Sequence, residues 1–340
     1  MPHSQLGSNH LANDDKRAWI SDRFRQAFSP YKRNIGMSAE TLQNTISLNE
    51  NASINHEDGS GQVDAMIRFK TAVAQQGALN DRVYLLDSGN EKPSDLIPWM
   101  RSIASKHGRT RLTAKLPMPK AKEFVAAGFE IEAVVPGMYN GVDGAFVRQF
   151  LSEARGVEPT AAARIERMEK VLAKAKQPYT LPALPEGCVL SEMGPTDAEE
   201  ISAHLSSVFD SYPFPVEDPE FIRSEMDAGT RYFAVKLNGA IIAMSSAECN
   251  NTHKYAECTD FATLPEWRGK ALALHLLHHM EEALDAAGIH GHYSIARSTE
   301  FGMNLVFARA GFELTGTLIN STHIGGGIES MNIWAKYTGK

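Results

Sequence analysis

The sequence predicts an α+β (α/β-like) protein with a mixed central β-sheet. Along residues 81–337, short strand-like runs alternate with amphipathic segments that a glycine ends. The strand-like runs outnumber the helical ones, and this alternation favours one sheet covered by helices. The chain has 340 residues, of which 43% are hydrophobic and 22% charged, so it is long enough to form two cores.

Three segments precede the part of the chain that carries the chemistry. Residues 1–60 are polar and poorly periodic, so we expect an N-terminal extension that is disordered or loosely docked. Residues 61–157 are expected to form a first domain, with strands at 81–89, 109–117, 129–141 and 144–152 and helices at 94–108 and 120–128. Residues 158–187 are expected to form a helix and a proline-containing linker, which acts as a hinge.

A second domain is expected over residues 188–340. A hairpin is predicted at 231–249, because Asn238-Gly239 is a strong signal for a tight turn between two strands. The other expected elements are strands at 188–193, 254–264, 291–296, 312–319 and 330–337, and helices at 195–209, 218–229, 269–288 and 301–311.

The two domains share a sequence echo. FVAAGFEIEAVV at 124–135 matches FARAGFELTGTL at 307–318, and the same helix–strand order flanks both. We therefore expect the first domain to be a degenerate copy of the second. The alternative is that helix–glycine–strand corners resemble one another in unrelated domains.

Composition excludes several classes of function. The net charge of −7 argues against a nucleic-acid partner, which favours a basic face. The three cysteines show no metal-ligand spacing, so no metal site is expected and a reducing cytoplasm fits. No signal-like segment or run of ~18 apolar residues appears, so we expect no membrane association.

Residues 259–273, TDFATLPEWRGKALA, carry the clearest chemical signal. A strand enters a turn at Pro265, and Arg268, Gly269 and Lys270 are expected to open a long helix. The first amides of a helix lack partners and carry partial positive charge, so they suit a pyrophosphate. A basic helix start on a solvated loop is the alternative.

The same segment resembles the acetyl-CoA signature R-x-x-G-x-G/A of the GNAT acetyltransferase superfamily, and 304–312 resembles the end of a conserved GNAT helix. The resemblance implies a GNAT fold for 188–340, a degenerate GNAT-like domain for 61–157, and acetyl-CoA as co-substrate. It also implies a set of cofactor-binding residues, with the arm of the cofactor along a splayed strand edge. They are Phe261, Thr263, Arg268, Gly269, Lys270, Ala271, Leu272, Ala273, Asn304 and Phe307.

Two positions depart from the GNAT pattern. Ala271 replaces the middle glycine; we expect the helix to form, with the added methyl group near the pyrophosphate weakening or displacing the cofactor. Phe307 stands where many relatives have a tyrosine that protonates the departing thiolate. That proton must then come from water or another group.

Segments from both domains, including AVVPGMYNG, TDFATLPEWRGKALAL and GGGIESMNIWAKY, resemble the β-lysine N6-acetyltransferase family. This resemblance implies acetylation of the side-chain amine of β-lysine to give N6-acetyl-β-lysine, an osmolyte of salt stress. Two alternatives stay open. One is another small amine, such as lysine, diaminobutyrate or a polyamine, and the other is a non-catalytic acyl-CoA-binding module.

An acceptor amine near pKa ~10.4 must lose a proton before it can attack a thioester, which costs roughly 4–5 kcal/mol at pH 7. A carboxylate base is therefore expected. Glu257 is ranked first, Asp260 second and Glu248 third. Glu257 and Asp260 would point to opposite faces of a regular strand, so only one should face the acceptor unless a bulge intervenes.

β-Lysine also has a carboxylate, for which Arg297 is the expected partner. Tyr212 and Phe214 are expected to wall the acceptor channel, and Tyr139 and Asn140 to reach over from the first domain. A homodimer is compatible with the sequence.

Overall fold

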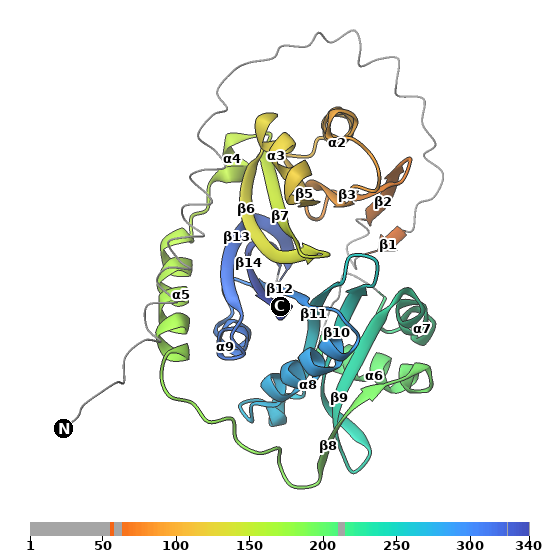
Figure 1. The fold of residues 1–340 in the computed structure, drawn as a ribbon, viewed down its shortest axis with the longest axis vertical. Coiled ribbons are helices and arrows are strands. Elements are labelled where there is room, and N and C mark those ends of the chain that lie inside the picture. The colour runs from red at the N-terminus through yellow and green to blue at the C-terminus, as the bar shows by residue number, and fades with distance from the viewer. Residues whose placement is uncertain (1–54, 58–62, 210–214, 325, 340) are drawn as a thin grey trace, which may run out of the picture. The chain divides into compact units, whose positions relative to one another are not determined.

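The computed structural model describes residues 55–57, 63–209, 215–324 and 326–339. Most of the predicted N-terminal extension, together with Tyr212 and Phe214, lies outside the described residues. Within the described residues fourteen strands join into one mixed sheet, in the order β1-β2-β3-β4-β5-β7-β6-β13-β14-β12-β11-β10-β9-β8 (Figure 1). The sheet runs across the predicted boundary between the two domains, so we refer below to a first and a second half.

The first half comprises seven strands and four helices of the described chain. These are β1 (Asn55–Glu57), β2 (Val63–Phe69), β3 (Ala72–Gly77), β4 (Arg82–Asp87), α2 (Pro93–His107), β5 (Arg111–Pro117), α3 (Met118–Ala126), β6 (Glu130–Tyr139), β7 (Val142–Phe150), α4 (Glu153–Gly156) and α5 (Ala161–Ala175).

The second half has the elements expected from the sequence, with small shifts at their ends. These are β8 (Cys188–Met193), a 3₁₀ turn (Pro195–Asp197), α6 (Ala198–Val208), α7 (Pro219–Ala228), β9 (Thr230–Leu237), β10 (Ala240–Asn250), β11 (Tyr255–Thr263), a 3₁₀ turn (Pro265–Trp267), α8 (Leu272–Ala286), β12 (Gly291–Arg297), α9 (Phe301–Arg309), β13 (Glu313–Ile324) and β14 (Gly327–Tyr337).

The hairpin of β2 and β3 was not predicted from the sequence. Its turn is formed by Lys70 and Thr71, and Lys70 adopts a left-handed φ of +54°. A glycine, asparagine or aspartate usually marks such a turn, and none is present here. β3 also pairs with β4, so the hairpin is part of the larger sheet.

The two halves repeat one order of strand pairing. In the first half β4 pairs parallel with β5, β5 pairs with β7, and β7 pairs with β6. In the second half β11 pairs parallel with β12, followed by β14 and β13 in the same antiparallel relation. α2 and α3 occupy the chain positions of α8 and α9. A degenerate copy would produce this repetition; common origin of the halves stays a prediction.

The halves join where β6 and β13 lie side by side (Figure 1). Gly316 of β13 faces Ala133 of β6, and a Cβ on Gly316 would lie 1.9 Å from the carbonyl oxygen of Glu132. Only glycine allows the backbones to approach this closely. The junction therefore depends on the missing side chain.

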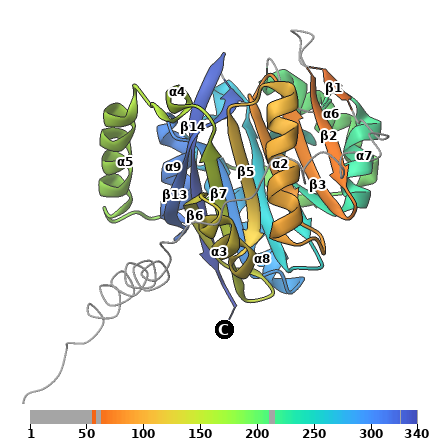
Figure 2. The same ribbon diagram turned by 90° about the horizontal axis from the view of Figure 1, so that it is seen from above.

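Helices cover most of the sheet, but one region is covered by strands. α2 lies along the strands of the first half in Figure 2, and α2 and α3 pack on its buried residues. In the second half, α8 and α9 contribute to one apolar cluster and α6 and α7 to another. A fourth cluster joins residues of β6 and β7 to Tyr255 and Tyr293 of the second half. No helix of the described residues is long and apolar enough to cross a membrane.

Candidate active site

The parallel strands β11 and β12 pair over only a short distance. Their pairing begins at Tyr255 and ends at Glu257, opposite Tyr293. Beyond that point β11 stays paired with β10, and β12 stays paired with β14. The two strands therefore diverge and leave an edge of β11 open, as the resemblance implied for the arm of the cofactor.

A β-bulge lies on β11 next to this divergence. Met244 pairs with Ala262 and Ser246 with Thr259, so two β11 residues, Asp260 and Phe261, stand opposite Ser245. Asp260 has a left-handed φ of +52°. A bulge changes the side to which the following side chains point.

Because of the bulge, three carboxylates lie within electrostatic reach of one another. Glu248 and Glu257 stand directly opposite each other on β10 and β11. The protein atoms packed around Glu248, and then the negative charges of Glu257 and Asp260, raise its pKa. Its side chain is nevertheless exposed, so a ligand can reach it. The carboxylates that the sequence ranked separately form one cluster.

Glu257 differs from Glu248 in its partners. The hydroxyl of Tyr293 donates a hydrogen bond to Glu257 at 2.6 Å. Burial raises the pKa of Glu257, and the charge of Lys115 and the bond from Tyr293 partly offset this rise. Asp260 accepts a hydrogen bond from the Ser246 hydroxyl. Among the three carboxylates, Glu257 is therefore the one that accepts a hydrogen bond from Tyr293. The nearby charge of Lys115 also favours its ionised form.

The second feature of the site is the start of α8. The helix begins at Leu272, and Ala271 is its N-cap residue. Within the described chain, the amides of residues 271–273 have no hydrogen-bond partner. Arg268 and Lys270 are exposed beside them. These amides and cations suit a phosphate group, so the phosphate site stays a prediction for this helix start.

The backbone at this helix start differs from the expectation. Arg268, Gly269 and Lys270 form the turn before the helix instead of its first residues. Ala271 is not helical: its φ of +59° is left-handed, where Gly269 also lies. The Cβ of an L-residue costs energy in this conformation, so alanine strains the position that glycine occupies in the GNAT signature.

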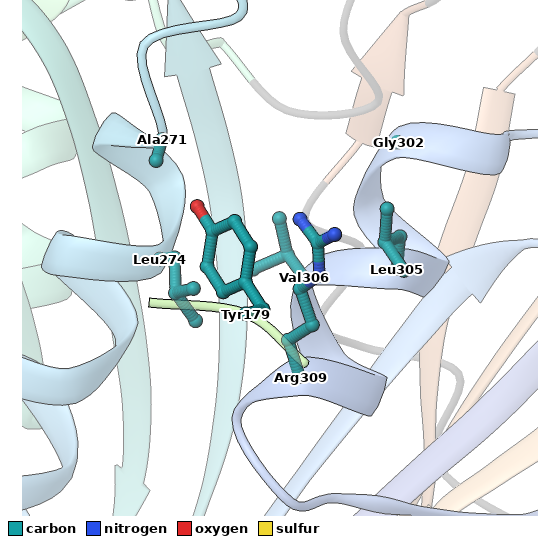
Figure 3. Close-up of a pocket in the computed structure, with 7 residues that line it drawn as sticks. All are labelled: Tyr179, Ala271, Leu274, Gly302, Leu305, Val306 and Arg309. Carbon is teal, nitrogen blue, oxygen red and sulfur yellow. The ribbon is translucent and has the colours of Figure 1, made fainter. Parts of the chain in front are cut away.

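A small cleft separates the start of α8 from α9. Figure 3 shows Tyr179 between them, with its hydroxyl directed toward Ala271. The guanidinium of Arg309 lies 3.7 Å from the centroid of the Tyr179 ring. Neither residue was predicted from the sequence: Tyr179 lies in the expected linker, and Arg309 lies within 304–312 but was given no role there. The cleft is lined by Tyr179, Ala271, Leu274, Gly302, Leu305, Val306 and Arg309.

Three predicted cofactor-binding side chains lie in the protein interior instead. Phe307 is buried and packs edge-on against Phe261. The Asn304 amide donates to the carbonyl of Arg297 and accepts hydrogen bonds from Asn332 and Trp334. Leu272 is buried as well. Their side chains hold α9 and α8 in place, and the cofactor-binding role expected of these three residues stays a prediction.

Arg297 and Thr263 also have partners within the protein. The guanidinium of Arg297 binds Glu329 on β14, with nitrogen–oxygen distances of 3.1 and 2.7 Å. The Arg297 guanidinium, which was predicted to bind a substrate carboxylate, is thus paired with a carboxylate of the protein itself. The carbonyl oxygen of Thr263 accepts a hydrogen bond from Arg268 at 3.2 Å.

The first half does reach the second half next to the carboxylates. The ring of Tyr139 packs against His253 and Tyr255, and the amide of Asn140 donates to the carbonyl of His253 at 2.9 Å. Lys115 of β5, which the sequence analysis missed, donates to the Tyr293 hydroxyl. Among the described residues, no group of three or more His, Cys, Asp or Glu side chains is placed to hold a metal ion.

Replacing Ala271 by glycine should relieve backbone strain at the start of α8. The free energy of unfolding should rise by about 1 kcal/mol, measured by chemical denaturation. Ala273→Gly is the matched control in the first turn of the same helix, where glycine should lower that free energy by roughly 0.5–1 kcal/mol. Equal losses of stability in both variants would contradict the strain at Ala271.

Sequence comparison with known proteins also indicates an acetyltransferase. Residues 200–312 match the model described as Acetyltransferase (GNAT) family. The chain is 32% identical over 274 residues to the β-lysine N(6)-acetyltransferase of Methanococcus maripaludis, covering 81% of this chain and 99% of that protein.

Two further relatives match shorter stretches. The N-acetyltransferase YodP of Bacillus subtilis is 33% identical over 61% of this chain and 75% of its own. The β-lysine N(6)-acetyltransferase of Methanosarcina mazei is 34% identical over 45% of this chain and 56% of its own. The expected GNAT fold and the expected enzyme class, an N-acetyltransferase, are confirmed. A relative matched along nearly its whole length, together with the family model, shows that the chain belongs to the GNAT family of acetyltransferases.

Proposed function

We propose that this enzyme moves the acetyl group of acetyl-CoA to the side-chain amine of β-lysine. The observation that carries the proposal is the cluster of Glu248, Glu257 and Asp260 beside the point where β11 and β12 diverge. An ammonium group relieves the repulsion among such carboxylates. The near full-length similarity to a β-lysine N(6)-acetyltransferase supports this choice of amine.

In the proposed mechanism, the carboxylate cluster first binds the acceptor as a cation. Glu257 then accepts a proton from the ammonium, which frees the nitrogen lone pair. Acetyl-CoA supplies the thioester, whose C–S bond breaks as the new C–N bond forms. The nitrogen releases its surplus proton to water as the amide forms, and the leaving thiolate takes a proton from water, in keeping with a thiol pKa near 8.5. Phe307 is buried in the core and donates no proton.

The start of α8 is the proposed site for the coenzyme phosphates. The unpartnered amides of residues 271–273 carry partial positive charge, and Arg268 and Lys270 add full charges. The open edge of β11 beyond Glu257 is the proposed path of the pantetheine arm. This arrangement brings a bound thioester toward the carboxylate cluster.

Acetylation changes the charge of β-lysine in a way that suits the proposed role of the product. β-Lysine carries two ammonium groups and one carboxylate, and N6-acetyl-β-lysine has lost one positive charge. The product therefore has no net charge at neutral pH. We propose that it serves in the cytoplasm as a compatible solute under osmotic stress.

A second candidate acceptor is a diamine or polyamine without a carboxylate. The observation that favours it is the ion pair of Arg297 with Glu329. Arg297 was the predicted partner of a substrate carboxylate, and it is already paired within the protein. Such a cation would still match the carboxylate cluster. The two candidates differ in whether a substrate carboxylate contributes to binding.

A panel of amines should separate these acceptors. We expect free thiol to be released fastest with β-lysine, and the product mass to be higher by one acetyl group. The panel includes lysine, diaminobutyrate, putrescine and spermidine at equal concentrations. Faster turnover of spermidine than of β-lysine would contradict the proposed substrate. Binding of acetyl-CoA by calorimetry without turnover of any amine would contradict catalysis.

Glu257→Gln should remove the proton acceptor. We expect kcat to fall about 10²–10⁴-fold with little change in the dissociation constant of CoA. Glu257 acts in its ionised form and burial raises its pKa, so kcat/KM of the unmodified enzyme should rise as the pH increases through that pKa. The variant should lose this limb of the pH profile.

Two further variants complete this test. Glu248→Gln should mainly raise the KM for the amine, because Glu248 is exposed and lacks the hydrogen bond from Tyr293. Glu282→Gln, on the exposed side of α8, is the control and should behave as the unmodified enzyme. If Glu248→Gln abolished kcat and Glu257→Gln did not, the two roles would be exchanged.

A further inference from the structure

Lys115 belongs to the first half of the molecule, but its ammonium group lies against the second half. Its Nζ atom is 3.2 Å from the hydroxyl oxygen of Tyr293. The same atom lies 5.3 Å from the ring centroid of Tyr255 and 5.7 Å from that of Tyr293. Such cation–π contacts stabilise a charged ammonium group. Lys115 is thus held by aromatic residues of β11 and β12.

The hydrogen bonds from Lys115 run in one direction. Lys115 donates to the oxygen of Tyr293, and the hydroxyl of Tyr293 donates to Glu257 at 2.6 Å. Ammonium groups have no acceptor, and the tyrosine has a single hydroxyl proton. The chain therefore ends on an acceptor, the Glu257 carboxylate. Each bond polarises the next one, so this arrangement favours the ionised form of Glu257.

The surroundings keep Lys115 charged. Burial by itself would lower the pKa of Lys115, but Tyr255, Tyr84 and Glu257 raise it above its ordinary value. The titratable groups around Lys115 and Glu257 come from both halves. They are Tyr84 on β4, Tyr139 on β6, Glu225 on α7, Glu248 on β10, His253 in the following loop, Tyr255 and Asp260 on β11, and Tyr293 on β12.

The corresponding position in the first half has no carboxylate. Counted from the first parallel pair, Glu257 of β11 stands at the third position, opposite Tyr293. The third position of β4 is Tyr84, opposite Thr113. The first half therefore cannot repeat the base of the second, and it supplies Lys115 to the second half instead.

We propose that Lys115 is a positioning residue for acetyl transfer: through Tyr293 it holds Glu257 ionised and oriented toward the acceptor amine. This inference rests on the proposed role of Glu257 and not on the identity of the amine. It also assigns a function to the first half, which completes the active site with a side chain. Lys115 itself transfers no proton to the substrate.

The test uses the full-length enzyme, saturating acetyl-CoA and the amine that the unmodified enzyme acetylates fastest. Lys115→Met should lower kcat/KM for the amine at least tenfold at pH 7. Its pH profile should move to higher pH by about one unit, because removing a nearby cation disfavours the carboxylate. The KM for acetyl-CoA should change by less than about twofold. Lys115→Arg should restore part of the activity.

Two variants separate positioning from folding. Lys122→Met, on the exposed side of α3, is the matched control and should leave the profile unchanged. Tyr293→Phe removes the hydroxyl that relays the bond to Glu257 and should move the profile in the same direction. In the double variant, the shift should stay below the sum of the two single shifts.

Each outcome of these experiments either supports or overturns the positioning role of Lys115. Lower activity with an unmoved pH profile in Lys115→Met would mean that Lys115 has only a structural role. If Lys115→Met does not fold, an unmoved profile in Tyr293→Phe overturns the proposal. Faster acetylation of another amine than of β-lysine overturns the proposed substrate and leaves this test intact. An enzyme that acetylates no amine overturns both.

Discussion

The constraint on which the site depends is the early end of the pairing between β11 and β12. After Glu257 the two parallel strands follow different neighbours, because β11 stays with β10 and β12 with β14. This separation leaves an edge of β11 open, and α8 follows the same strand in the chain after a short turn. The β-bulge at Asp260 then turns a second carboxylate toward Glu257. The proposed path of the cofactor arm and the carboxylate cluster both lie at this interrupted pairing.

The continuous sheet explains how the first half takes part in this site. The close approach of β6 and β13 at Gly316 joins the halves into one sheet, and the cluster around Tyr255 and Tyr293 packs them against each other. Strands of the first half thereby cover a part of the second half that helices leave uncovered. Only from this position can Lys115 reach the hydroxyl of Tyr293.

Single residues of the family signature show which structural features a local sequence motif predicts and which it does not. The unpaired amides at the start of α8, the proposed phosphate site, were predictable, because they are a local property of residues 268–273. Asn304 and Phe307 belong to the same family signature, but their side chains support the packing of α9. Ala271 was expected to be helical, because alanine has a high helix propensity. It is instead a left-handed N-cap, a conformation that helix propensity does not describe. A signature therefore combines residues that bind with residues that hold the binding elements.

The sequence by itself determined the fold class, the order of the elements in the second half, the presence of a helix after Pro265 and the three candidate carboxylates, because periodicity, glycine positions and local motifs act over a few residues. Only the tertiary structure decided which groups meet. The bulge that gathers the carboxylates, the ion pair of Arg297 with Glu329 and the contact of Lys115 with Tyr293 join strands that are distant in the chain. Such pairings depend on register and on the packing of two sheet faces, and no local pattern encodes them.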